Sequence, residues 1–446
     1  MKGAARSPLP ALLIVGLGTS IVPLDSAVNI GFPAIVGHFG LSIPMIQWVV
    51  IAYVLTQTSL MLSFGRIGDM LGHRRIFLFG TGISTVAFVA CALAPSFAAL
   101  LVARVLQGIG AGLILACGPA LATSLYPEAM RTRILAHYMV MFGIGSALGP
   151  AVFGVLVAQF GWSAVFSFRA PVALAAFLLG WSLPRLPRGA AEPFDAAGGA
   201  LLALALSCLL LALNRLRPPG PETLLLAALA AAGFALFYRQ ERRVSHPIID
   251  FAYFRDAGFT AINVMNVLAN LSAFSIMLLA PFYLSRVPGL SLPQAGFVLS
   301  ASPCGIILAA PVAGRLAANL APRRIVLIGC ALSAAGLFGI SLSEEIPLLA
   351  AAMAVQGFGL GLFQVAYFDL ITAAIPAHNR GVAGALGMAT RTIGNVGGAT
   401  VLMLAFQALH GAGAEGDTFL PAFQATFRIA AAIPFAMVLL GVWPRN

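Results

Sequence analysis

Long apolar runs, separated by short polar stretches, make up almost the whole chain. A helix needs about 20 apolar residues to cross roughly 30 Å of hydrocarbon, and these runs reach that length. They predict fourteen membrane-spanning helices, at residues 10–36, 44–64, 76–94, 97–125, 135–158, 163–183, 196–213, 222–238, 259–285, 294–313, 325–343, 346–375, 382–408 and 424–443. We therefore expect an all-α membrane protein.

The pattern repeats once along the chain. Residues Gly65–Gly80 read GRIGDMLGHRRIFLFG and return 249 residues later as GRLAANLAPRRIVLIG at Gly314–Gly329, with eight of the sixteen positions identical. The same offset places Gly145 on Gly394. One register thus relates two long parts of the chain, which indicates a duplicated membrane domain.

The repeat predicts the domain organisation. Two six-helix halves, residues 1–190 and 256–446, enclose two extra central helices and a cytoplasmic linker at 191–255. Secondary transporters use duplicated halves that rock against each other around a binding site between them. Transport is therefore the first hypothesis.

Composition and charge agree with a membrane location. Residues are 60% hydrophobic and 9% charged, a mixture that would not keep a water-soluble domain of this size in solution. If the N-terminus is cytoplasmic, the inner loops hold most basic residues, whereas the outer side holds Arg215, Arg217, Arg286 and Arg428. The positive-inside rule then places both termini in the cytoplasm. Contact of the inner loops with anionic lipid accounts for the net charge of +11 without a nucleic-acid partner.

Enzyme and cofactor motifs give no support for another class. No HExxH, GxSxG or Walker pattern stands in a suitable context, and the 5 cysteines show no metal-binding spacing. The GxGxG runs at Gly108 and Gly357 lie inside expected spans with no preceding strand, so they do not indicate a dinucleotide site. We expect a protein that is not an enzyme and has no catalytic residues, metal or cofactor.

Ionisable residues within the spans are the first candidates for function. Asp25, Asp369, Arg104, Arg169 and Arg391 fall inside apolar runs, where a charge costs about 2.5 to 3.5 kcal/mol on insertion scales. We expect Asp25 and Arg104 to pair, or to compete through a proton, in the outer half of the bilayer. The alternative is a static ion pair that fixes helix packing.

Polar side chains near these charges indicate a cavity. Asn29 follows Asp25 by one helical turn, and Asn263, Asn266 and Asn270 form a stripe at the same spacing. These stripes are expected to line a central aqueous cavity, or alternatively to hydrogen-bond between helices. The other cavity candidates are Gln107, Arg169, Asp369 and Arg391; the arginines could instead snorkel or bind backbone carbonyls.

A glycine-rich and arginine-rich loop is predicted at residues 65–75. Its candidate gating residues are Gly65, Arg66, Asp69, Gly72, Arg74 and Arg75. Asp69 is expected to bind the helix start next to Arg323 and Arg324 and so latch an inner gate. The repeat copy has Ala318 in its place, and a plain turn is the alternative.

Small residues and a proline mark the span at 135–158. Gly145, Gly149, Pro150 and Gly154 would let this helix approach a neighbour closely, and Pro150 would kink it. We expect this helix at a moving interface between the halves.

Four of these motifs together resemble one family over nearly the whole chain. They are Leu24–Pro33, Gly65–Arg75, Arg104–Gly112 and Gly145–Gly154, and they are similar to those of the major facilitator superfamily, specifically its fourteen-helix drug:proton antiporters. The resemblance implies the major facilitator fold, a location in the cytoplasmic (inner) membrane, and export of hydrophobic, often cationic compounds in exchange for protons. It also implies proton coupling through Asp25 and Arg104, and an export-associated motif at Gly145, Gly149, Pro150 and Gly154.

Three residues depart from the pattern of that family. Met70 and His73 replace basic residues of the loop, and Arg169 stands where similar proteins often have Asn. An added cation would disfavour cationic substrates, so Arg169 leaves the charge of the substrate open.

Three functions follow from the sequence. Proton-driven export of amphiphilic small molecules comes first, proton-coupled uptake of a solute is second, and a non-transporting membrane receptor or scaffold is third. The expected partners are the substrate, protons and the lipid bilayer. Whether a periplasmic adaptor protein extends the pathway stays open.

Overall fold

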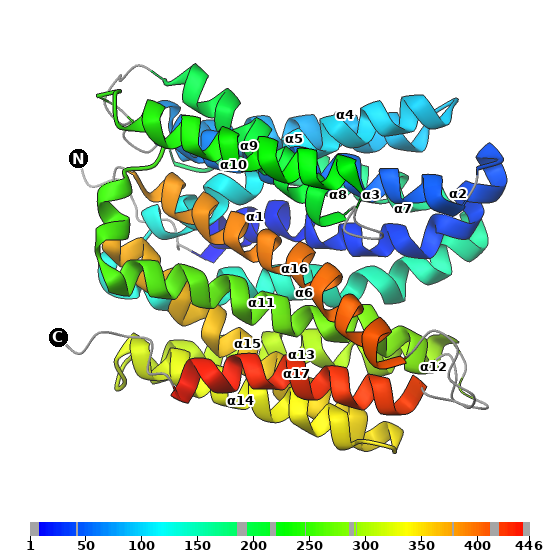
Figure 1. The fold of residues 1–446 in the computed structure, drawn as a ribbon. Coiled ribbons are helices and arrows are strands. Elements are labelled where there is room, and N and C mark those ends of the chain that lie inside the picture. The colour runs from blue at the N-terminus through cyan, green and yellow to red at the C-terminus, as the bar shows by residue number, and fades with distance from the viewer. Residues whose placement is uncertain are drawn as a thin grey trace. The chain divides into compact units, whose positions relative to one another are not determined.

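The computed structural model describes residues 9–41, 43–184, 194–214, 220–245, 247–284, 290, 292–376, 379–410 and 419–439. The regular structure in these ranges is helical (Figure 1), as the length and spacing of the apolar runs predict. Arg215, Arg217 and Arg286, on which the orientation prediction partly depends, lie outside the described residues.

The chain divides into two compact units. Unit 1 contains Met1–Leu209, Ala227–Asp250 and Ile375–Met388, and unit 2 contains Leu210–Leu226, Phe251–Ala374 and Ala389–Asn446. These units do not follow chain order, because three helices contribute residues to both: α9 (Ala196–Asn214), α10 (Pro221–Glu241) and α16 (Arg380–His410). The division into halves at residues 190 and 255 stays a prediction.

Unit 1 holds the helices of the first repeat. They are α1 (Leu9–Ser20), η1 (Pro23–Gly31), α2 (Phe32–Phe39), α3 (Ile43–Leu71), α4 (His73–Ala92), α5 (Phe97–Ser124), η2 (Glu128–Met130), α6 (Arg131–Phe160), α7 (Ala164–Ser167) and α8 (Arg169–Gly180).

Unit 2 holds the helices of the second repeat. They are η3 (Phe251–Arg255), α11 (Ala257–Leu284), α12 (Leu292–Leu299), α13 (Ala301–Leu316), α14 (Pro322–Leu342), α15 (Ile346–Ala374) and α17 (Phe419–Leu439).

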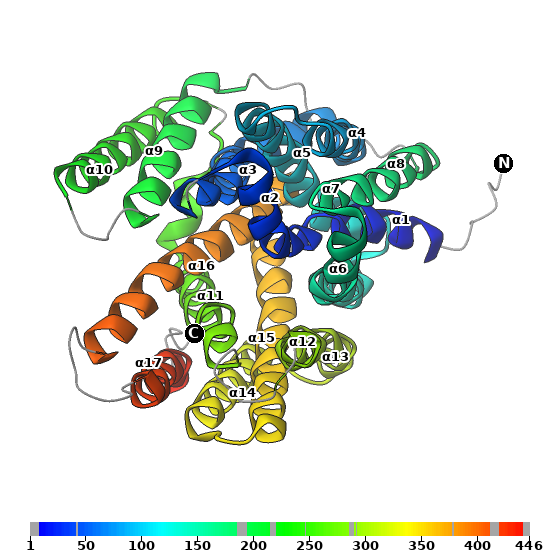
Figure 2. The same ribbon diagram turned by 90° about the vertical axis from the view of Figure 1, so that its right-hand side faces the viewer.

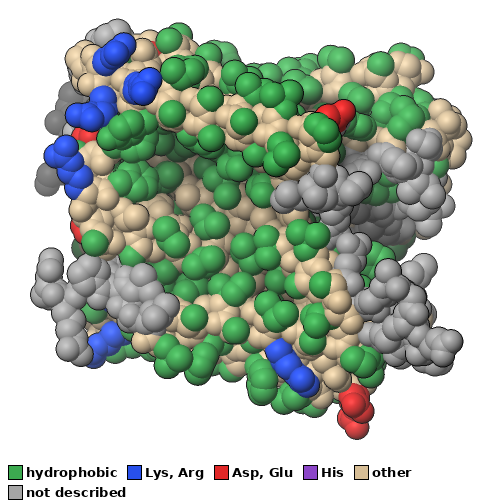
Figure 3. Space-filling view, viewed as in Figure 1, with side chains coloured by type: hydrophobic (Ala, Val, Ile, Leu, Met, Phe, Trp, Pro, Cys, Tyr) green, Lys and Arg blue, Asp and Glu red, His purple; other side chains and the backbone are tan. Residues whose placement is uncertain are grey.

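Ten helices among the described residues are long and apolar enough to cross a membrane, and two shorter apolar helices cover Pro10–Asp25 and Ala164–Gly180. Each of the fourteen expected segments contains helix, but the count of fourteen spans stays a prediction. Hydrophobic side chains are spread over the whole face seen in Figure 3, where charged side chains are few. An apolar surface of this extent is typical of a protein whose solvent is lipid.

The first expected span is not one continuous helix. Pro23 begins η1 and Pro33 stands in the first turn of α2, so the α-helical hydrogen bonding changes between them. This short segment carries Asp25.

Close helix crossings occur at equivalent positions in both units. In unit 1, a Cβ on Gly80 of α4 would lie 2.9 Å from the carbonyl oxygen of Gly110 in α5. In unit 2, the equivalent Gly329 of α14 would place a Cβ 2.7 Å from the carbonyl oxygen of Gly359 in α15. Since such contacts exclude any side chain, the GxGxG runs serve helix packing. Figure 2 shows α4 beside α5, and α14 beside α15.

The expected loop at residues 65–75 is mostly helical, which corrects the prediction. Helix α3 continues to Leu71 and α4 begins at His73, so that Gly72 alone connects them. Its φ of 94° lies in the left-handed region that glycine adopts without strain. Asp69 consequently projects from a helix, rather than from a flexible loop.

Candidate functional site

Asp25 and Arg104 form an ion pair inside unit 1. Nη1 and Nη2 of Arg104 donate to Oδ1 and Oδ2 of Asp25, both at 2.7 Å. This two-pronged geometry is the strongest that an arginine and a carboxylate can adopt. The guanidinium is fully buried, and its Nε donates to the carbonyl oxygen of Val49 at 2.8 Å. The expected pairing is present, whereas its part in proton coupling stays a prediction.

Gln107 joins the same carboxylate. Its Nε2 donates to Oδ1 of Asp25 at 2.8 Å, while its Oε1 accepts from Nη1 of Arg104 at 2.7 Å. Arg104 and Gln107 are three residues apart on α5, so they lie on one face of that helix. The amide therefore bridges both members of the ion pair.

Arg169 is a second cation on Asp25, a contact that the sequence did not indicate. Nη1 of Arg169, the first residue of α8, donates to Oδ1 of Asp25 at 2.9 Å, and Nη2 donates to the carbonyl oxygen of Ile21 at 3.1 Å. The side chain is 1% exposed, and its Nε has no hydrogen-bond partner among the described residues. Two buried guanidiniums thus share one carboxylate, which leaves the cluster with an excess of positive charge.

Aromatic rings stabilise this excess charge. The guanidinium carbon of Arg104 lies 4.5 Å from the ring centre of Tyr53, and that of Arg169 lies 4.4 Å from the ring centre of Phe88. Cation–π contacts of this kind offset part of the cost of removing a cation from water. Nothing in the sequence distinguishes these two aromatic residues from the many others in the chain.

The small-residue helix α6 packs against the segment that carries Asp25. A Cβ on Gly145 would collide with the carbonyl oxygen of Ser20 and lie 2.8 Å from Cγ of Pro23. Gly145 therefore allows α6 to approach the break in the first span. The backbones of Gly149, Pro150 and Gly154 lie in α6, but the side-chain surroundings of Pro150 and Gly154 are outside the described part, as is the side chain of Asn29.

The asparagine stripe of unit 2 forms a buried network in which the described side-chain hydrogen bonds link amides and hydroxyls. Nδ2 of Asn266 donates to Oγ1 of Thr390 at 2.9 Å. Nε2 of Gln364 lies 3.3 Å from Oδ1 of Asn266 and 3.2 Å from Oδ1 of Asn270, and the Tyr367 hydroxyl donates to Oδ1 of Asn263 at 3.0 Å. These bonds join α11 to α15 and α16, which is the interhelical alternative to a cavity lining.

The remaining charged candidates lie on the same helices of unit 2. Asp369 is 5% exposed and follows Tyr367 by two residues in α15. Arg391 is partly buried and follows Thr390 in α16. Their roles in a cavity stay predictions.

Asp69 binds the first turn of α16, which corrects the expected partner near Arg323 and Arg324. Its Oδ1 accepts from the backbone N–H of Gly381 at 2.7 Å and its Oδ2 from that of Val382 at 3.2 Å. A carboxylate is stabilised at this position, because the first N–H groups of a helix have no partner within it. His73 Nε2 lies 2.8 Å from Oδ1 of Asp69.

Two further contacts hold the start of α16 within unit 1. Nη1 of Arg66 donates to Oδ1 of Asn379 at 2.8 Å, and Nη2 of Arg380 donates to Oε2 of Glu128 at 2.7 Å. The glycines at 65 and 381 approach so closely that a Cβ on Gly65 would lie 2.5 Å from the carbonyl oxygen of Gly381. Of the other expected gating residues, Arg74 donates to the carbonyl oxygen of Trp181 and Arg75 is exposed.

Comparison with known proteins identifies the same architecture. The Major Facilitator Superfamily profile matches residues 9–261 and 262–445. The chain is 32% identical over 410 residues to the tetracenomycin C resistance and export protein of Streptomyces glaucescens, covering 90% of this chain and 76% of that protein. It is 29% identical over 381 residues to the riboflavin transporter RibZ of Clostridioides difficile (strain 630), covering 84% of this chain and 82% of that protein.

Solved structures share the fold at low sequence identity. The human organic anion transporter MFSD10 (TETRAN) aligns with a TM-score of 0.69 at 15% identity, covering 98% of this chain and 99% of that chain. The proton:xylose symporter XylE aligns with a TM-score of 0.64 at 17% identity, covering 97% of this chain and 96% of that chain.

Proposed function

Because the chain belongs to the major facilitator superfamily, a family of membrane transporters, we propose that it is a proton-coupled exporter of hydrophobic or amphiphilic small molecules. The observation that carries this proposal is the carboxylate of Asp25, held by Arg104, Arg169 and Gln107 beside a break in the first span. The name of the tetracenomycin relative supports export. We further propose an inner-membrane location with both termini in the cytoplasm, from the distribution of arginines.

Proton binding at Asp25 would change the electrostatic interactions of Arg104 and Arg169. A proton on the carboxylate neutralises the negative charge that lies between the two guanidiniums, which then repel each other and lose their ion pairs with Asp25. Arg104 retains its bond to Val49 and Arg169 its bond to Ile21. We propose that Arg169 moves, because it begins the short helix α8 and its Nε has no hydrogen-bond partner in the described part of the chain. Asp69 and the start of α16 are proposed to act as the gate latch.

The charge of the substrate decides the direction of coupling. A cationic substrate and a proton would both neutralise Asp25, so they compete for it, which is the requirement of antiport. An anionic substrate would bind the guanidiniums better after Asp25 is protonated, so the two bind together, which is the requirement of symport. The excess positive charge gives a specific reason to keep proton-coupled uptake of an anionic solute as the second candidate function.

The decisive test uses proteoliposomes loaded with a pH-sensitive dye under an imposed proton gradient. Neutral, cationic and anionic amphiphiles are added to wild type and to Asp25→Asn. For the exporter, we expect that one class of compound crosses the membrane of wild-type proteoliposomes while protons move in the opposite direction. In Asp25→Asn, no class should cause proton movement. Movement of the compound and protons in the same direction would contradict the exporter and favour the symport candidate. No movement with any compound, despite a folded protein, would contradict transport.

A further inference from the structure

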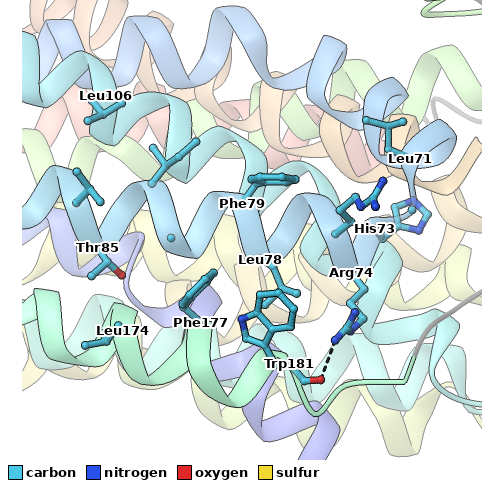
Figure 4. Close-up of a pocket in the computed structure, with 15 residues that line it drawn as sticks. Leu71, His73, Arg74, Leu78, Phe79, Thr85, Leu106, Leu174, Phe177 and Trp181 are labelled. Carbon is cyan, nitrogen blue, oxygen red and sulfur yellow. Dashed lines mark hydrogen bonds between the residues drawn. The ribbon is translucent and has the colours of Figure 1, made fainter.

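A groove on unit 1 lies apart from the Asp25 site. It has a volume of about 990 Å³ and is lined mostly by α4 and α8, together with Leu71 of α3, Gly72, Leu106 of α5 and Trp181, which follows α8. Figure 4 shows Leu174 and Phe177 of α8, and Trp181 directly after it, lying along Leu78, Phe79 and Thr85 of α4. None of the residues that line it belongs to the Asp25 site. The volume is within the range of sites that bind small molecules, about 300 to 1,000 Å³.

The groove opens on an apolar outer surface of the helices. Phe79 is 58% exposed, Val86 is 61% exposed and Trp181 is 62% exposed, and all three line the groove. Exposed apolar side chains on a membrane-spanning helix face hydrocarbon, because water does not reach them there. The groove is therefore accessible to a molecule that is already in the bilayer.

The helices α4 and α8, which form the walls of the groove, are in close contact with each other. A Cβ on Gly82 of α4 would lie 3.3 Å from the ring of Phe177, and Phe177 meets Trp181 edge to face at 6.1 Å. A Cβ on Gly180 of α8 would lie 2.6 Å from Leu78. Since α4 and α8 pack this tightly, the groove is preformed and does not require a ligand to open it.

One end of the groove is basic. His73, Arg74 and Arg75 begin α4 and line that end. Nη2 of Arg74 donates to the carbonyl oxygen of Trp181 at 2.7 Å, which holds its guanidinium at the end of α8 (Figure 4). His73 is bonded to Asp69, whereas Arg75 is exposed. Trp181 stands beside these cations, and tryptophan is enriched at the level of lipid headgroups.

We propose that this groove binds one anionic phospholipid. The phosphate would lie at Arg74 and Arg75, and one acyl chain would lie along Phe79, Val86 and Phe177. The two guanidiniums match a negative headgroup, the apolar part of the groove matches a hydrocarbon chain, and the opening faces the bilayer. The arginine distribution predicts the cytoplasmic leaflet for this end, where anionic lipids attract basic segments. The inference does not depend on the direction or substrate of transport.

The repeat offers a matched control for the test. Arg323 and Arg324 begin α14 at the positions equivalent to Arg74 and Arg75, and both are exposed. Replacing either pair by glutamine removes the same charge from the same type of helix start. Only the first pair lines the groove. Val86→Trp provides a third variant, which fills the apolar part and leaves every charge in place.

Native mass spectrometry of the full chain, with phosphatidylglycerol and phosphatidylethanolamine of identical acyl chains, measures the binding. We expect wild type and Arg323→Gln/Arg324→Gln to retain one phosphatidylglycerol about tenfold more strongly than phosphatidylethanolamine, which corresponds to about 1.4 kcal/mol. Arg74→Gln/Arg75→Gln should lose this preference. Arg75→Gln alone, which preserves the Arg74–Trp181 bond, should weaken it. Val86→Trp should lose the retained lipid.

A photoreactive acyl chain on phosphatidylglycerol locates the site. We expect crosslinks within residues 76–86 and 174–181. Equal loss of lipid in the two arginine-pair variants would overturn the proposal, because it would indicate general attraction of lipid to basic loops. Unchanged binding in Val86→Trp, crosslinks confined to other helices, or displacement of the lipid by a transported amphiphile would overturn it as well.

Discussion

The two units contain comparable helices but differ in the charge of their buried polar clusters. In unit 1, Asp25 is bonded by Arg104 and Arg169. In the asparagine cluster of unit 2, the described hydrogen bonds link amide and hydroxyl side chains, as between Gln364 and Asn270, and backbone carbonyls. Close glycine crossings are common to both units. The duplicated packing thus does not require charge, and the charged cluster demands a separate explanation.

The two clusters respond differently to the loss of one polar or charged group. Removing one amide from a neutral network leaves polar groups that can find other partners, and such bonds in membranes contribute only about 0.6 kcal/mol on average. Removing one member of a buried ion pair leaves an uncompensated charge. The charged cluster can therefore respond to a proton or a charged substrate, whereas the amide cluster mainly joins helices.

The largest expected effect is that of truncating the shared carboxylate. Asp25→Ala leaves Arg104 and Arg169 buried without a counter-ion, which we expect to cost about 3 to 5 kcal/mol of stability. Asn270→Ala in the amide cluster should cost no more than about 1.7 kcal/mol. Thermal and denaturant-induced unfolding in detergent measures the stability of both variants.

A second substitution controls this prediction. Asp25→Ala/Arg169→Leu removes one of the two stranded charges, so it should recover part of the lost stability. If the double variant is as unstable as the single one, repulsion between the guanidiniums is not the cause of the loss.

The next effect concerns the charge preference of binding. Arg169→Asn keeps the Asp25–Arg104 pair but removes the excess positive charge of the Asp25 cluster. Two unit charges 4 Å apart interact by about 4 kcal/mol at an effective dielectric constant of 20. We therefore expect the ratio of affinities for a cation and an anion of similar shape to rise by at least tenfold, or about 1.4 kcal/mol. Equilibrium binding of the two compounds measures the ratio.

Arg169→Lys is the matched control for that change. It keeps the charge and loses the planar fork of arginine, so the charge preference should stay near that of wild type. A shift of the same size in Arg169→Lys would attribute the preference to shape instead of charge.

The two copies of the glycine-rich motif provide a smaller test. Asp69 is 4% exposed and binds the start of α16, whereas the equivalent Ala318 is exposed beyond the end of α13. Asp69→Ala should lower stability by about 0.5 to 2 kcal/mol, as for the loss of a helix cap. Ala318→Asp should change it by no more than about 0.5 kcal/mol. Thermal unfolding measures both variants. If both lose the same stability, the contact between Asp69 and the start of α16 is not the source of the effect.

Sequence patterns predicted the positions of the helices better than the contacts between them. Apolar run length depends only on neighbouring residues, and the repeat gave independent support to the helix assignments. The Asp25–Arg104 contact could be expected because charges in apolar spans need partners. Its second partner could not, since Arg169 lies 144 residues from Asp25 and its orientation depends on how α8 packs.

The sequence predicted polar contacts for the motif at Gly65–Arg75, but neither its helical structure nor the partner of Asp69. Glycines suggested a loop, whereas α3 continues through them because Gly65 packs against Gly381 in a helical conformation. Asp69 then meets a segment 312 residues later. The residues Gln364, Tyr367 and Thr390 were also missed, because single polar residues in apolar helices give no indication of which face they occupy.

The smallest expected effect belongs to an ion pair of unit 1 that is exposed. The hydrogen bond from Arg380 lowers the pKa of Glu128 below its ordinary value of 4.5. A lowered pKa in the folded state means that the pair stabilises the protein above pH 4.5, and that this contribution is lost as the pH falls below that value. Because the Glu128 side chain is 57% exposed, solvent screening limits the contribution to about 0.2 to 1 kcal/mol.

Glu128→Gln therefore separates the effect of burial from that of charge. Its stability should lie slightly below that of wild type at pH 7.5, and the difference should decrease as the pH falls below 4.5 and disappear once Glu128 is protonated in the folded state. Thermal unfolding at a series of pH values measures both proteins. A loss for Glu128→Gln as large as that for Asp25→Ala would mean that burial does not distinguish the charged cluster, because an exposed pair would then contribute as much as a buried one.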